Sequence, residues 1–135
     1  MHFVDTNVLL YFVSGDPAEA AKQAKAAELL EREDLCLSVQ VLQEFYVQAT
    51  RPARADPLMH EEALGLIASW RRYPILDTTL ELMEQALAAK ARWAISYWDA
   101  AILEAARAMG CPELLSEDLA DGQDYGGVRV VNPFA

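Results

Sequence analysis

The sequence has few of the residues that build a cross-linked or zinc-stabilised protein. Among 135 residues there are two cysteines, Cys36 and Cys111, and two histidines, His2 and His60. The cysteines are too few and too far apart for a disulfide framework or a Cys-x-x-Cys metal pair, so we expect two small buried thiols. We do not expect either histidine to be a metal ligand.

Long apolar runs are also missing. The apolar stretch after Met1 is interrupted at Asp5, and it has neither a basic leading region nor a small-residue cleavage site. No segment approaches the roughly 20 consecutive apolar residues that a membrane-spanning helix needs. We therefore expect a cytoplasmic protein that has no membrane partner.

Basic residues are outnumbered, with 11 Lys and Arg against 21 Asp and Glu and a net charge of −10. Taken alone, this balance argues against nucleic-acid binding, because Lys and Arg drive phosphate binding. A cluster of acids that holds divalent cations is a different case. The bound cations would make the local field positive where a phosphate group must sit.

The residues that are present indicate an ordinary globular domain, with 53% apolar and 24% charged residues. Short apolar runs alternate with segments of helical spacing, which predicts a three-layer α/β/α sandwich with a mainly parallel central sheet. We expect a single domain over residues 1–135. The expected strands are 3–4, 35–38, 74–76, 114–115 and 128–131, and the expected helices are 8–13, 17–32, 38–49, 57–72, 78–92 and 96–109.

Turn and capping residues set several of these limits. Asp16 and Asp56 are each followed by proline, which predicts two helix N-termini with proline in the first position. Gly110, with Pro112 just beyond it, predicts the end of the helix that begins near Ser96. No internal repeat and no low-complexity segment interrupts this organisation.

Four acidic residues occupy positions near the ends of strands. Asp5 directly follows the first expected strand, and Asp118 closely follows 114–115. Glu44 lies early in the helix after the second strand, and Asp99 lies in the first turn of its helix. Ligands of an open parallel sheet bind beyond the carboxyl ends of its strands, so we expect all four acids at one edge.

Glu44 is the most informative of these acids because its neighbours, Phe45 and Tyr46, are apolar. A carboxylate on a largely buried helix needs a cation or a hydrogen-bonding partner, since an unpaired buried charge is costly. Taken singly, each acid also has a purely structural interpretation. Asp5 or Asn7 could cap a helix, and Asp99 could form a capping box with Ser96. Glu44 could pair with Arg51, and Asp118 could shape a turn beside Gly122.

Four segments in order resemble the motifs of PIN-domain ribonucleases. The first runs from Phe3 to Tyr11 and contains Asp5-Thr6-Asn7, and the second runs from Ser38 to Phe45 around Glu44. The third and fourth are 96–102 and 115–119. Together they span nearly the whole chain, and its length resembles that of the VapC toxins of bacterial and archaeal toxin–antitoxin pairs.

This resemblance implies an endoribonuclease that uses Mg²⁺ or Mn²⁺ and leaves a 5′ phosphate and a 3′ hydroxyl. Carboxylate oxygens are the ligands that these hard cations prefer, and the ions would activate the attacking water and stabilise charge on the scissile phosphate. The resemblance also implies a VapB-type antitoxin as partner and a homodimer. The implied metal ligands are Asp5, Glu44, Asp99 and Asp118, with hydrogen-bonding support from Thr6, Asn7 and Ser116.

The fourth motif departs from the family pattern in two respects. It contains Glu117, Asp118 and Asp121, and Ser116 occupies a position where threonine is common. We choose Asp118 because a turn immediately after the strand brings it nearest to Asp5, and we keep Asp121 in reserve.

Two other functions are compatible with parts of this pattern. A haloacid-dehalogenase-like phosphatase would require Asp-x-Asp after the first strand, where this sequence has Asn7. A non-catalytic binding module of the same fold would be favoured by the loss of a site acid, and all four are present. Trp70, Trp93 and Trp98 are expected in the core, with a homodimer face as the alternative.

Overall fold

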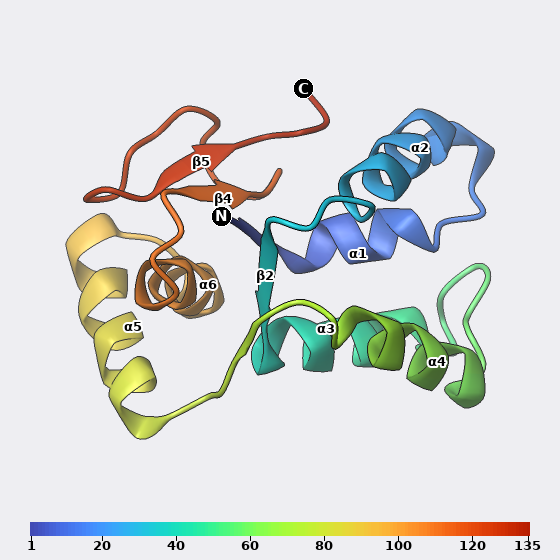
Figure 1. The fold of residues 1–135 in the computed structure, drawn as a ribbon, viewed down its shortest axis with the longest axis horizontal. Coiled ribbons are helices and arrows are strands. Elements are labelled where there is room, and N and C mark those ends of the chain that lie inside the picture. The colour runs from blue at the N-terminus through green and yellow to red at the C-terminus, as the bar shows by residue number, and fades with distance from the viewer.

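The computed structural model describes all residues from 1 to 135, in which short strands alternate with helices (Figure 1). The strands are β1 (His2–Val4), β2 (Leu35–Ser38), β3 (Ile75–Leu76), β4 (Glu113–Leu115) and β5 (Arg129–Val131). The helices are α1 (Thr6–Phe12), α2 (Ala20–Leu29), α3 (Val39–Ala49), α4 (His60–Trp70), α5 (Leu80–Trp93) and α6 (Tyr97–Ala108), with a short 3₁₀ turn, η1, over Pro17–Glu19.

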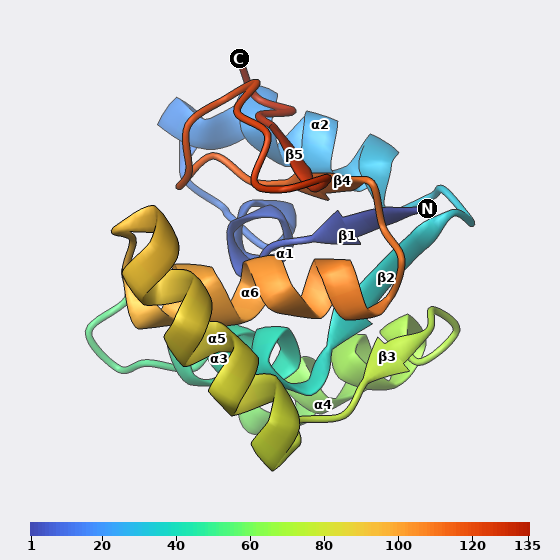
Figure 2. The ribbon, with the colours of Figure 1, turned by 90° about the vertical axis from the view of Figure 1, so that its left-hand side faces the viewer.

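The five strands form one sheet in the order β3-β2-β1-β4-β5, and each neighbouring pair is parallel. The predicted α/β fold is confirmed, and the sheet is wholly rather than mainly parallel. Helices α5 and α6 lie on one side of the sheet, and α1 and α2 lie on the other (Figures 1 and 2). Val4 aligns with Leu115, and Leu115 aligns with Val131, so these three strands end at the same edge.

The strands supply the centre of a core of 26 buried residues. Phe3, Cys36, Leu114 and Val130 have no exposed surface. A parallel sheet that is covered on both faces requires such continuous apolar strands, because neither face meets water. Both cysteines are buried and free, as the sequence predicted.

Side-chain caps begin α3, α5 and α6, and one of them, Ser96, is a cap that the sequence predicted. The side chains of Ser38, Thr79 and Ser96 accept hydrogen bonds from the first turns of α3, α5 and α6. At the other end of α6, Gly110 has a positive φ of 69°, a conformation that glycine adopts without steric cost.

The helix start predicted at Asp16-Pro17 is confirmed, because Asp16 caps the 3₁₀ turn η1 with Pro17 in its first position, and α2 continues directly from this turn over Ala20–Leu29. The start predicted at Asp56-Pro57 is wrong. Helix α4 begins at His60 instead of at residue 57, because the Glu62 carboxylate accepts a hydrogen bond from the backbone N–H of Met59, 2.9 Å away, and so fixes the first turn there.

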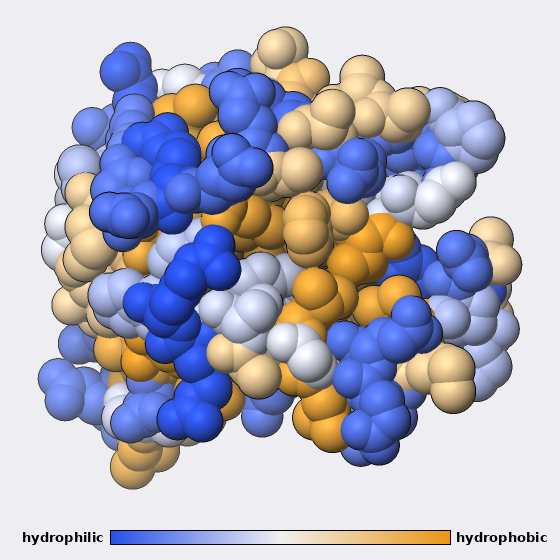
Figure 3. All heavy atoms as spheres, turned by 45° about the vertical axis from the view of Figure 1, so that its right-hand side comes forward, coloured by the Kyte–Doolittle hydropathy of each residue, from blue (hydrophilic) through white to orange (hydrophobic).

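Hydrophobic side chains also reach the surface, as the space-filling view shows for one face (Figure 3). Trp70 is buried, whereas Trp98 is 63% exposed, so the expectation of a core position was wrong for Trp98. Leu80 and Met83 of α5 are exposed as well. No helix is both long enough and apolar enough to cross a membrane.

Candidate active site

Asp5 lies at the junction between β1 and α1. It is the N-cap of α1, and its Oδ1 accepts a hydrogen bond from the backbone N–H of Thr6 at 2.6 Å. Its Oδ2 accepts a hydrogen bond from the hydroxyl of Ser116, also at 2.6 Å. Asp5 is 4% exposed and Ser116 is fully buried. The end of β1 is thereby joined to the end of β4 through a buried carboxylate.

The environment of Asp5 favours a bound proton or a cation. The pKa of the Asp5 carboxyl is raised to about 7, mainly by burial and to a smaller extent by the charges of Asp118 and Glu44, although the hydrogen bonds from Ser116 and Thr6 lower it. No basic side chain forms an ion pair with Asp5. A divalent cation would remove the repulsion that these three acids exert on one another.

Glu44 projects from α3 toward α1. Its Oε2 accepts a hydrogen bond from the Thr6 hydroxyl at 3.1 Å, and its Oε1 accepts one from the Gln40 amide at 2.6 Å. The ion pair with Arg51 that the sequence left open is not formed. Gln40 was not among the predicted site residues, although it stands four residues before Glu44 and therefore on the same helix face.

Asp99 lies in the first turn of α6, where its backbone N–H donates to the Ser96 hydroxyl at 3.1 Å. The capping interaction that the sequence offered as an alternative is therefore present. Partial burial raises the pKa of the Asp99 carboxyl, the Ser96 hydroxyl lowers it, and the charge of Asp118 raises it. Asp99 thus stands near Asp118 as well as beginning a helix.

The three acids of the fourth motif have different surroundings. The backbone N–H of Asp118 donates to Ser116 Oγ at 3.1 Å, and its exposed carboxylate acts on both Asp5 and Asp99. Glu117 turns away to bind the Tyr11 hydroxyl and the Lys22 ammonium. Asp121 accepts a hydrogen bond from the backbone N–H of Asn132 at 2.9 Å. Of these three acids, Asp118 is the one whose charge acts on the Asp5 and Asp99 carboxylates.

The four predicted acids are thus linked to one another at the carboxyl edge of the sheet, but in this arrangement no group of three or more His, Cys, Asp or Glu side chains is placed to hold a metal ion. Both oxygens of Asp5 and both oxygens of Glu44 accept internal hydrogen bonds. The donor set consists of oxygen atoms alone, which suits Mg²⁺ and Mn²⁺ in chemistry. Coordination of one ion by several of these acids would require side-chain rotation.

The predicted supporting residues divide into two groups. Thr6 and Ser116 are hydrogen-bonded to Glu44 and Asp5, as described. Asn7 contributes no such bond, because its buried amide nitrogen and oxygen have no partner. Buried polar atoms without partners are uncommon in folded proteins, so the Asn7 amide is available to a ligand.

Fold and site together define an α/β protein with an acidic centre at the carboxyl edge of a parallel sheet. The sequence pattern of the PIN domain family matches residues 2–120, and the chain belongs to this family. The family is not that of the phosphatase alternative. A search of curated protein sequences found no match.

Solved structures of toxins share this fold. A toxin–antitoxin complex from Klebsiella pneumoniae matches with a TM-score of 0.73 and 21% identity over 98% of each chain. VapC20 from Mycobacterium tuberculosis, a sarcin–ricin loop cleaving toxin, matches with a TM-score of 0.69 and 23% identity over 87% of this chain and 92% of that chain. FitAcB from Neisseria gonorrhoeae matches with a TM-score of 0.63 and 17% identity over 99% of each chain.

Proposed function

We propose that residues 1–135 form a single PIN domain that acts in the cytoplasm as a metal-dependent endoribonuclease, the toxin of a VapBC-type toxin–antitoxin pair. The observation that carries this proposal is the group of acids around Asp5. They come from four separate segments of the chain, and no basic side chain pairs with any of the four. A set of carboxylates that serves only structure would normally have neutralising partners.

Asp5, Glu44 and Asp99 would hold the principal Mg²⁺ or Mn²⁺ ion, and Asp118 would hold a second ion or orient the attacking water. When bound, the ions supply charge stabilisation at the scissile phosphate and activation of water for in-line attack. The Thr6 and Ser116 hydroxyls orient the Glu44 and Asp5 carboxylates, and the unpaired Asn7 amide is available to the substrate.

RNA is the proposed substrate because one member of the same fold is described as a sarcin–ricin loop cleaving toxin. An antitoxin is the proposed partner because other members occur in toxin–antitoxin complexes. The net charge of −10 supports a basic partner segment near the acids. A homodimer is the second proposed assembly, with Leu80, Met83 and Trp98 at its interface, because these side chains are exposed around a groove of about 430 Å³ between α5, α6 and α3.

The test is cleavage of purified cellular RNA by the wild-type protein and by Asp5→Asn, each with Mg²⁺, Mn²⁺, Zn²⁺ or excess EDTA. We expect products with 5′ phosphates from the wild type in Mg²⁺ or Mn²⁺, and none in EDTA or from the variant. Cleavage that continues undiminished in excess chelator would rule out the metal mechanism. Metal binding without any cleavage would favour the non-catalytic binding module.

A further inference from the structure

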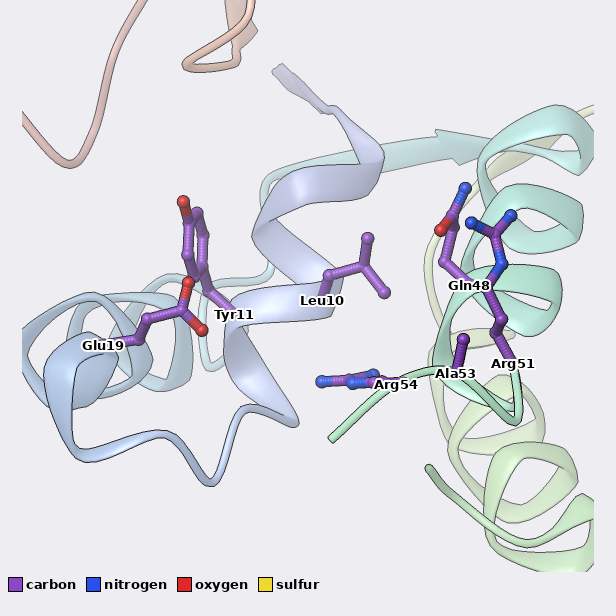
Figure 4. Close-up of a pocket in the computed structure, with 7 residues that line it drawn as sticks. All are labelled: Leu10, Tyr11, Glu19, Gln48, Arg51, Ala53 and Arg54. Atoms are coloured by element: carbon purple, nitrogen blue, oxygen red, sulfur yellow. The ribbon is translucent and has the colours of Figure 1, made fainter. Parts of the chain in front are cut away.

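A cavity of about 410 Å³ lies at the opposite end of α1 from Asp5 (Figure 4). It opens where α1, the η1 turn and the segment after α3 come together. Its lining includes Leu10, Tyr11 and Glu19 on one side and Gln48, Arg51 and Arg54 on the other. None of these residues belongs to the group of acids around Asp5.

The two arginines of this cavity have no acidic partner. Neither Arg51 nor Arg54 forms an ion pair, and Nη1 of Arg54 is buried without any hydrogen-bond acceptor. Arg54 extends from the loop toward α1, and Arg51 lies beside Gln48 (Figure 4). The one acid in the lining, Glu19, accepts a hydrogen bond from the Ser14 hydroxyl at 2.7 Å. The lining is therefore net positive in a protein whose charge is −10.

The cavity and the acids lie along the same two neighbouring helices. Helices α1 and α3 lie side by side and run in the same direction (Figure 1). They meet at the acid end through the hydrogen bond from Thr6 to Glu44. Gln48 lies one turn beyond Glu44, and Arg51 follows just past the end of the helix. At a rise of 1.5 Å per residue, Arg51 is about 10 Å farther along than Glu44.

We propose that Arg51 and Arg54 bind a backbone phosphate of single-stranded RNA, a few nucleotides from the scissile bond. The proposal rests on the proposed nuclease function, which puts the scissile phosphate at the acids. Phosphates recur about every 3.4 Å along one helical strand, so about two to four nucleotides span the distance from Glu44 to Arg51. A guanidinium donates parallel hydrogen bonds to phosphate oxygens, and Nη1 of Arg54 has no acceptor within the protein.

An RNA phosphate fits the cavity better than an isolated acidic side chain of a protein partner. A protein with a net charge of −10 repels a polyanion, so an RNA that reaches the acids is helped by local positive charge near them. Arg51 and Arg54 supply two such charges near the end of α3. An RNA strand bound at the acids has a phosphate at every nucleotide, so one of them reaches the two arginines, whereas a peptide would need an acidic residue in the right position.

The test is binding of a fluorescein-labelled, mixed-sequence RNA 12-mer to the cleavage-deficient Asp5→Asn protein at several salt concentrations. Arg51→Gln and Arg54→Gln are added singly, and Arg129→Gln is the matched control. Arg129 is exposed and forms no ion pair. It lies in register with Glu113, which lies in register with His2 at the start of β1, so Arg129 is at the amino ends of the strands and Asp5 is at the carboxyl ends. Thermal unfolding of each variant shows whether it is folded. Arg51 is exposed, so Arg51→Gln should fold normally and test the proposal even if Arg54→Gln is unstable.

We expect each substitution at 51 or 54 to weaken RNA binding about tenfold and to make the dependence of log affinity on log salt shallower by about 0.7. Arg51→Lys should restore part of the affinity, and Arg129→Gln should change little. In the cleavage-competent protein, Arg51→Gln should raise KM more than it lowers kcat.

Three results would overturn the proposal. If Arg51→Gln and Arg54→Gln bind RNA like Arg129→Gln while the wild type cleaves RNA, the phosphate site is wrong and the nuclease function stands. If these substitutions weaken only antitoxin binding, the cavity receives an acidic side chain of the antitoxin. If the wild type neither cleaves nor binds RNA in Mn²⁺, both the function and this site are wrong.

Discussion

The Ser116 hydroxyl donates a 2.6 Å hydrogen bond to Asp5 although the two residues are 111 positions apart in the chain. The same hydroxyl accepts a hydrogen bond from the backbone N–H of Asp118. One buried hydroxyl therefore holds the carboxylate at the end of β1 and the turn that carries the fourth acid. The Ser116 oxygen therefore helps to set the position of Asp5 relative to Asp118, whereas Glu44 is held by Thr6 and Gln40.

We predict that Ser116→Ala will weaken Mn²⁺ binding and RNA cleavage by about tenfold or more, a usual cost of losing a residue that orients a metal ligand. The substitution removes a hydrogen bond that lowers the Asp5 pKa, so the carboxyl should hold its proton to a higher pH. Ser116→Thr is the matched control because it keeps the hydroxyl. Calorimetric titration with Mn²⁺ measures the affinity, and equal affinities for the Ala and Thr variants would contradict this role.

We predict that Asp5→Asn will abolish cleavage and stabilise the metal-free protein at pH 8, with Glu44→Gln and Asp99→Asn also inactive. Because burial raises the Asp5 pKa from 3.8 to about 7, the native state keeps a proton that the unfolded chain has released. Stability should therefore fall as pH rises from about 4 to about 7, by an amount of the order of 4 kcal/mol, and this dependence should be absent in Asp5→Asn.

Urea unfolding in EDTA at a series of pH values measures this effect of Asp5. Asp16→Asn is the control, because Asp16 is also an N-cap but is exposed and stands apart from the acids. A difference in stability between Asp5→Asn and the wild type that does not change with pH would mean that Asp5 is ionised throughout. Full cleavage by a folded Asp5→Asn protein would remove Asp5 from the site.

We predict that Asp118→Asn will reduce cleavage more than Asp121→Asn. The Asp118 carboxylate acts on Asp5 and Asp99, whereas Asp121 accepts a hydrogen bond from the backbone of Asn132. Asp121→Asn keeps an oxygen that can accept this bond, so both its stability and its activity should stay close to wild type. Single-turnover cleavage rates decide between the two acids, and the reverse order would identify Asp121 as the fourth.

We predict that the cognate antitoxin inhibits by inserting an Arg or Lys among the carboxylates. The acids around Asp5 have no internal basic partner, and a guanidinium can bond two carboxylate oxygens at once. Each basic residue of the antitoxin's toxin-binding segment would be replaced by Gln, and residual cleavage and Mn²⁺ binding would be measured in the complex. If the complex persists, no replacement restores cleavage, and Mn²⁺ enters with unchanged affinity, the antitoxin instead covers an apolar groove between helices.

We predict that Trp98→Glu will convert a homodimer to monomers. Trp98 is 63% exposed beside Leu80 and Met83, and a charged side chain there would be buried without a partner in a dimer. Val47→Glu is the control, because Val47 is a similarly exposed apolar residue on α3, outside this groove. Analytical ultracentrifugation measures both, and a wild-type protein that is monomeric at high concentration would contradict the prediction.

Local patterns in the sequence were sufficient for most of the fold. The apolar run Leu35–Ser38 is β2 with the predicted limits, and Ser38 begins α3 because a serine hydroxyl is a strong N-cap. At Asp56-Pro57 the same reasoning failed. The start of α4 is determined by the hydrogen bond from the backbone N–H of Met59 to the Glu62 carboxylate, and Asp56-Pro57 does not begin a helix.

The site was predicted less completely because some of its contacts are not local. The strand-end rule indicated that Asp5 and Asp118 would be neighbours, and the sheet order accounts for this because β1 lies next to β4. The partners of Glu117 could not be predicted, since Tyr11 and Lys22 are brought to it only by the packing of α1 and α2. Arg51 and Arg54 face a cavity that exists only after the loop folds back toward α1.

The order of strands also determines when the acid cluster can form during synthesis. Residues 1–112 contain three of the four acids, but β4, which carries Ser116 and Asp118 beyond its end, can enter the sheet beside β1 only after those residues have been made. A chain still attached to the ribosome therefore lacks the buried hydroxyl that orients Asp5 until residue 116 has left the exit tunnel. The contact that orients Asp5 is therefore among the last that can form as these residues are synthesised, long after Asp5 itself has been made.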